Sequence, residues 1–251
     1  MLKKLIKHEL IYILRTFWPI YFTYLIITFA VCLIPHLFRA FGTITMLGEI
    51  ILFIFTGLYI IATIVLILMA VFDNIRRYSN NMFSDEGYLT NTLPVPMYQH
   101  LVAKLVGGII NFLASIIVTV AGFIMIGGKE GFILFGKVWN NTGLKEEVLS
   151  AKSLGILFFF TSIYLFVVTL GYLMCSVNLI SGAKSILGVL LSIIIVILTI
   201  LSASKLGEYC IMAKDLSELQ SVIVCAVYLL ILAALMFTVS LLTIRYDLNL
   251  Q

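Results

Sequence analysis

Six long apolar stretches constrain this 251-residue sequence more than any other feature. A helix needs about 20 apolar residues to cross a hydrocarbon core of about 30 Å, and helices satisfy their backbone hydrogen bonds internally. The sequence therefore predicts an all-α, polytopic membrane protein with six transmembrane helices. The alternating pattern of an outer-membrane barrel is absent from the sequence. The predicted spans cover approximately residues 17–38, 50–72, 101–126, 154–177, 185–204 and 221–244.

Composition excludes several classes of protein. Charged residues make up 11% of the chain and apolar residues 62%, whereas a soluble domain has roughly 25% charged residues. A soluble enzyme, a disordered tail and a nucleic-acid-binding domain are therefore excluded, and we expect no nucleic-acid partner. The four cysteines have no metal-ligand spacing, so we expect neither a metal nor a cofactor.

Basic residues predict the orientation. Lys3, Lys4, Lys7 and Arg15 precede the first span, and the first helix usually decides the topology. The run 17–38 is too long for the core of a signal peptide, so we expect it to be retained. We predict a multi-pass protein of the cytoplasmic membrane with both termini in the cytoplasm. The long connections are then 73–100 inside, and 127–153 and 205–220 outside.

The predicted spans carry no ionisable residue near their centres, and Lys104, close to the end of one, is expected to extend to the interface. Ion-coupled transport usually needs such groups and is therefore disfavoured. Polar residues in the spans either form hydrogen bonds between helices or line a weakly polar path. They are Thr23, Thr28, Thr63, Asn111, Ser115, Thr119, Thr161, Ser162, Thr169, Asn178 and Ser192.

One nucleotide-binding pattern is incomplete. Residues 131–137 match the start of a phosphate-binding loop, but Val138 replaces the Ser or Thr that would bind magnesium. We therefore expect no ATP hydrolysis by this chain alone, and we expect it not to be an enzyme.

The first 16 residues predict a basic amphipathic helix in the membrane interface. Lys4, Lys7 and Arg15 lie on its polar side, and Trp18 with Pro19 predicts a turn into the first span. Glu9 falls on the apolar side. It either reaches water from a partly immersed helix or contacts a partner or a cationic neighbour.

Residues 84–96 predict a short cytoplasmic helix between the second and third spans. Leu89 and Leu93 are four residues apart and share a face, Pro94 ends the helix, and Pro96 opens the third span at its first helical position. Such a bracketed helix is typical of one that lies in a groove of a partner.

Two segments resemble the membrane subunit of a type-2 ATP-binding-cassette (ABC) exporter, in the short form common in Gram-positive bacteria. Residues 4–10, with Arg15, resemble the interfacial helix of that family. Residues 85–95 resemble its coupling segment, at the same place in the order of six spans. The resemblance implies an ATPase-coupling role for Asp85, Glu86, Gly87, Tyr88, Leu89, Leu93 and Pro94.

By that resemblance, the whole chain is a single permease domain over residues 1–251. Its partners are a second permease chain, a separate ATPase subunit that hydrolyses ATP, and the lipid bilayer. Its substrate is an amphipathic or hydrophobic molecule such as a peptide, lipid or drug. The alternatives are an ion-coupled or channel-like transporter without an ATPase, a structural or signalling membrane protein, and a membrane enzyme that acts on lipids.

Overall fold

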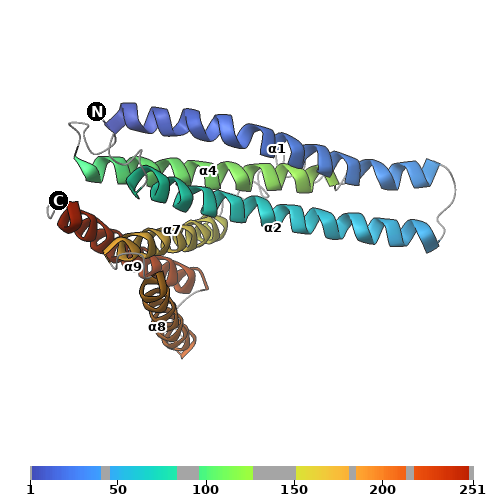
Figure 1. The fold of residues 1–251 in the computed structure, drawn as a ribbon. Helices are drawn as coiled ribbons and strands as arrows, with labels where there is room; N and C mark the ends of the chain where they lie inside the picture. Colours follow the sequence, from blue (N-terminus) through green and yellow to red (C-terminus); the bar gives the residue numbers. More distant parts are fainter. Residues whose placement is uncertain are drawn as a thin grey trace. The chain divides into compact units, whose positions relative to one another are not determined.

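The computed structural model describes residues 2–40, 46–83, 96–126, 151–180, 185–212 and 218–248, and every element in these ranges is an α-helix. The described helices are labelled in Figure 1. In chain order they are α1 (Leu2–Ala40), α2 (Met46–Phe83), α4 (Met97–Ile126), α7 (Ala151–Ile180), α8 (Ser185–Met212) and α9 (Glu218–Leu248). The prediction of an all-α protein is confirmed.

Five of these helices are long and apolar enough to cross a membrane. The candidate spans are Leu2–Leu33, Phe53–Met82, Met97–Ile126, Leu154–Val177 and Leu219–Ile244, and α8 contributes the shorter apolar segment Ile193–Ser202 among the described residues. The chain is thus a polytopic helical membrane protein.

Side chains are distributed as lipid contact requires. Large apolar side chains point outward, among them Trp18 at 69% and Phe53 at 80% exposure. Small or hydroxyl residues such as Ala70, Ser162 and Ala226 are fully buried. Helices in a bilayer gain little from burying apolar surface, and small residues let their backbones approach closely.

Contacts divide the chain into two compact units, which we describe separately. The first contains α1, the part of α2 up to Phe72, and α4 from Val106, which run alongside one another (Figure 1). A β-carbon on Gly122 would lie 3.0 Å from Cγ2 of Thr28 and 3.1 Å from the hydroxyl oxygen of Tyr59. Glycine therefore permits the close approach of α1, α2 and α4 at this point.

The second unit contains α7, α8, α9, the end of α2 from Asp73, and the start of α4 up to Leu105. Helix α7 packs along α9, and α8 contacts both. A β-carbon on Gly171 would lie only 2.7 Å from Cγ1 of Ile75, so α2 and α7 are in close contact there.

Two segments that were predicted as connections are largely helical where the structure describes them. Helix α2 continues past Phe72 to Phe83 and α4 begins at Met97, so the described parts of 73–100 are mainly helical. In the same way, α8 reaches Met212 and α9 begins at Glu218, within the predicted connection 205–220. The apolar windows end at the first charged residues, but a helix continues where its polar side chains find partners.

The predicted turn at Trp18 and Pro19 is also wrong, because α1 is one helix from Leu2 to Ala40. The amphipathic segment exists as the first part of α1 and not as a separate interfacial helix. Membrane helices tolerate proline where neighbouring groups re-satisfy the backbone, and the Pro19 ring is exposed. Pro96 precedes α4 by one residue, and its carbonyl oxygen accepts from the backbone nitrogen of Gln99 at 2.9 Å.

Candidate functional site

The seven predicted coupling residues lie outside the described residues, so their role stays a prediction. They are Asp85, Glu86, Gly87, Tyr88, Leu89, Leu93 and Pro94. The structure does describe the two helix ends that flank them: α2 ends at Phe83 and α4 begins at Met97. Polar side chains near these ends bond one another and the neighbouring helices.

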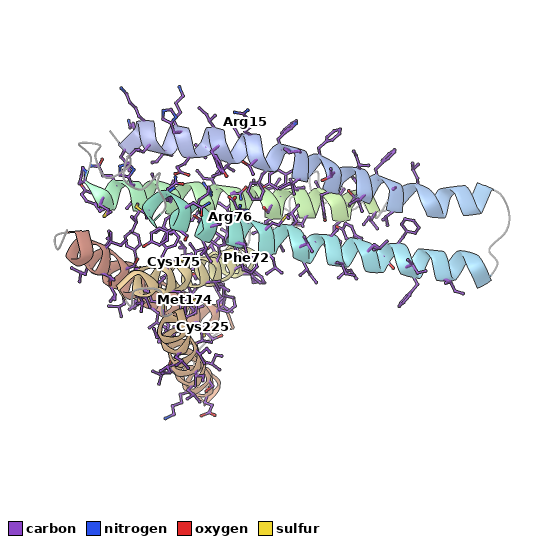
Figure 2. All side chains as sticks on the ribbon, viewed as in Figure 1. Arg15, Phe72, Arg76, Met174, Cys175 and Cys225 are labelled. Carbon is purple, nitrogen blue, oxygen red and sulfur yellow. The ribbon has the colours of Figure 1, made fainter. Side chains whose placement is uncertain are left out.

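The predicted interfacial residues lie on the first part of α1. Lys4, Lys7 and Arg15 are exposed, and Figure 2 shows Arg15 on the outer side of the helix. Glu9 is half-buried, and its Cβ would lie 3.4 Å from a β-carbon on Gly107 of α4. Glu9 therefore faces α4. This favours the interpretation that Glu9 contacts a neighbour within the protein over the interpretation that its carboxylate only reaches water.

Asn74 of α2 is bonded to two tyrosines of α7. Its Nδ2 donates to the hydroxyl oxygen of Tyr164 at 2.9 Å, and its Oδ1 accepts from the hydroxyl of Tyr172 at 2.8 Å. All three side chains are buried. Because a buried polar group without a partner is costly, this bidentate arrangement fixes the face that α2 turns toward α7.

Tyr78, one helical turn later, extends the same contact to α9. Its ring stacks on Tyr172, with centroids 4.0 Å apart and an interplanar angle of 16°. Its hydroxyl lies 2.9 Å from Oγ of Ser240 and 3.4 Å from Oγ of Ser176, and the two serine oxygens are 2.9 Å apart. Three hydroxyl groups thus join α2, α7 and α9.

We call this set of six buried side chains the α2-end network. Its members are Asn74, Tyr78, Tyr164, Tyr172, Ser176 and Ser240. The network consists of an amide, phenols and alcohols that bond one another. These are groups suited to orienting helices, and the network contains neither an acid–base pair nor a charged nucleophile.

Charged side chains surround the same helix ends. Nε of Arg77 lies 2.9 Å from Oδ2 of Asp73, with the geometry of an ion pair and not of an aligned hydrogen bond. Asn81 donates to the backbone carbonyl oxygen of Arg77 at 3.3 Å and accepts from Nζ of Lys104 at 3.0 Å, with its amide oriented to satisfy both. His100 is also buried.

These contacts correct two predictions. Lys104 is only 2% exposed, so its ammonium group does not extend along the surface to the interface. Asp73 and Arg77, which the prediction placed outside the second span 50–72, lie within the candidate span Phe53–Met82. Arg76, by contrast, is exposed (Figure 2).

The sequence did contain a signal for this site. Asn74, Tyr78 and Asn81 recur at intervals of four and three residues, which is the spacing of one helix face. Asp73 and Arg77 have the i, i+4 spacing of a helical ion pair. Both patterns were missed because the second span was expected to end at Phe72.

Polar residues of the first unit form a smaller seam between α1 and its neighbours. The Tyr21 hydroxyl lies 2.8 Å from Oδ1 of Asn111 and 3.0 Å from Oγ of Ser115, and the Tyr24 hydroxyl lies 3.1 Å from Oγ1 of Thr63. Here the predicted interhelical bonding is found. Several of the other predicted polar residues instead bond carbonyl oxygens of their own helix: Thr23, Thr28, Thr119, Thr161, Ser162 and Thr169.

Among the described residues, no three His, Cys, Asp or Glu side chains are grouped closely enough to hold a metal ion. Comparison with known proteins adds no identification: no family model, curated protein or solved structure matches this chain. The class that the described helices define is therefore a multi-pass α-helical membrane protein.

Proposed function

We propose that this chain is the membrane-spanning permease subunit of an ABC exporter, with ATP hydrolysis on a separate cytoplasmic ATPase subunit. The observation that supports the proposal most is the α2-end network. The end of α2 leads directly into residues 84–96, which resemble the coupling segment of that family, and the same helix end is bonded to α7 and α9.

The network suits this function mechanically. A displacement applied to residues 84–96 by the ATPase would reach Asn74 and Tyr78 within about three helical turns. These two side chains bond α7 and α9, so the three helices would move as one group. Shifting the equilibrium between the two facings of the transport path from 1:99 to 99:1 takes about 5.5 kcal/mol of differential binding. ATP would supply this free energy through the partner.

Membrane orientation follows from the proposal. Tyr78, Ser176 and Ser240 meet near the C-terminal ends of their helices, so α2, α7 and α9 end on one side of the membrane. We propose that this is the cytoplasmic side, that both termini of the chain lie there, and that the membrane is the cytoplasmic membrane. A second permease chain would complete the path for an amphipathic or hydrophobic substrate.

One observation favours a second candidate function. Asp73, Arg77, His100 and Lys104 are buried or nearly buried in helices that qualify as membrane spans, where ionisable groups often serve ion or proton movement. Ion-coupled transport without an ATPase is therefore the alternative. Their position at the ends of α2 and α4, away from the middle of the spans, favours the first proposal.

Isolation of the tagged chain from its own membranes separates the two proposals. The ABC proposal predicts a stoichiometric ATPase subunit with a complete phosphate-binding loop, and transport by inverted vesicles that needs ATP and survives an ionophore. A chain isolated without an ATPase, whose transport the ionophore abolishes, would support ion coupling instead.

A further inference from the structure

One face of α1 carries cations and then apolar residues in a single line. The five basic side chains near the start of the helix are all exposed: Lys3, Lys4, Lys7, His8 and Arg15. The large apolar residues that continue this line are exposed as well: Ile11, Leu14, Trp18, Phe22, Ile26, Phe29 and Leu33. At 3.6 residues per turn, both sets fall on about the same half of the helix circumference.

The opposite half of α1 packs against the other two helices of the first unit, α2 and α4. Ile13 and Phe17 are buried in a cluster with Ala70 of α2, and Glu9 faces Gly107 of α4. The carboxylate among the first 16 residues therefore lies on the packed side. The outer line of cations has no acidic member.

The length of the apolar part matches the hydrocarbon core of a bilayer, and the lysines fall at the level of one headgroup layer. At 1.5 Å per residue, the apolar part from Ile11 to Leu33 covers about 33 Å, close to a hydrocarbon thickness of about 30 Å. Lys7 then stands about 6 Å, and Lys3 about 12 Å, beyond the apolar end. The headgroup layer is roughly 5–8 Å thick, so Lys7 falls within it and Lys3 and Lys4 lie within a Debye length of about 8 Å.

We infer that the first turns of α1 form a binding surface for the headgroups of anionic phospholipids, with Lys3, Lys4 and Lys7 as the recognising groups. Lipid is favoured over a soluble protein partner because the same face continues into exposed apolar side chains at the depth of the acyl chains. A lipid whose tail lies along Trp18 and Phe22 brings its phosphate to the level of Lys7. Arg15, one turn inside, would extend its side chain toward the same headgroups.

Trp18 makes this inference measurable. The chain has two tryptophans, so a Trp139→Phe background leaves Trp18 as the one fluorophore of its kind. The full-length protein is placed in nanodiscs of phosphatidylcholine that contain increasing shares of phosphatidylglycerol, with bromine on the acyl chains of one lipid at a time. Quenching of Trp18 then reports which lipid occupies the α1 surface.

The expected result is an association constant for phosphatidylglycerol about fivefold above that for phosphatidylcholine. Lys7 is the lysine that falls within the headgroup layer, and one lysine close to an anionic surface contributes about 1 kcal/mol, which corresponds to this factor. The preference should fall to about one in the triple variant Lys3→Gln, Lys4→Gln, Lys7→Gln. It should persist in the matched variant that replaces the same three lysines with arginine, and it should weaken in the parent as salt approaches about 0.5 M.

Quenching by brominated phosphatidylcholine alone serves as the control for insertion and should be equal in all variants. No preference in the parent at low salt would overturn the inference and leave the cations to face a protein. A preference that the glutamine variant retains, or that the arginine variant loses equally, would overturn it as well. The inference does not depend on the proposed transport function.

Discussion

The hydroxyl oxygen of Tyr78 lies 2.9 Å from Oγ of Ser240, a residue 162 positions later in the chain. This contact joins α2 to α9, while the Tyr78 ring stacks on Tyr172 of α7. One side chain thus contacts two other helices through two different chemical groups. Its hydroxyl and its ring can be tested separately.

Tyr78→Phe should keep the stack with Tyr172 and lose the bonds to Ser176 and Ser240. The two serines still bond each other, so no buried hydroxyl is left without a partner. We expect a loss of about 1 kcal/mol in stability, the net value of one hydrogen bond, and a larger relative loss of transport. Thermal unfolding in detergent and transport in vesicles measure the two effects. The exposed Tyr98→Phe is the matched control and should change neither.

Asn74→Leu should be more destabilising than Tyr78→Phe. The substitution keeps an approximately similar side-chain volume but removes one hydrogen-bond partner from each of Tyr164 and Tyr172. Two buried hydrogen bonds are lost, at about 1 kcal/mol each, so we expect a loss of about 2 kcal/mol. Denaturant unfolding followed by circular dichroism checks this order. Equal stability of Asn74→Leu and the exposed control Thr238→Leu would contradict the network.

Gly171→Ala should be destabilising by about 1–3 kcal/mol, because the new methyl group would meet Ile75 at 2.7 Å or less. Gly57→Ala is the control: a β-carbon there meets nothing within 4 Å, so helix propensity alone should make it neutral or stabilising. In the double variant Gly171→Ala, Ile75→Ala, the two losses should be less than additive. Additive losses would mean that α2 and α7 are not in contact at this point.

Membrane topology gives a test of the orientation. A cysteine at position 90 should react with an impermeant thiol reagent only from the cytoplasm, and cysteines at positions 140 and 212 only from outside. The native Cys32, Cys175, Cys210 and Cys225 are first replaced by alanine or serine. Reaction at position 90 from outside would reverse the proposed orientation of residues 84–96.

The helices could be predicted from the sequence because a run of 20 apolar residues has few alternatives to a membrane span. Their ends could not. Asp73 interrupts the apolar window, yet the helix continues because Asp73 pairs with Arg77 and Asn74 bonds α7. In the same way, Pro19 was expected to turn the chain, but α1 continues through it.

The α2-end network was beyond sequence reasoning for a different reason. Helices α7 and α9 are apolar around most of their circumference, so their patterns do not reveal which side faces a neighbour. The pairing of Tyr78 with Ser240 depends on how three distant segments assemble. Only the spacing of Asn74, Tyr78 and Asn81 on one helix was available in advance.

Docking of the ATPase to residues 84–96 tests the central proposal most directly. We predict that Glu86→Ala, Tyr88→Ala and Leu93→Ala each weaken binding of the co-isolated ATPase roughly thirtyfold, corresponding to a loss of about 2 kcal/mol at an anchor residue. Abundance in the membrane should stay nearly normal, and Asn140→Ala and Lys145→Ala should leave docking unchanged. Normal docking and normal transport by all three variants would contradict the account, as would a loss of abundance without a specific docking defect.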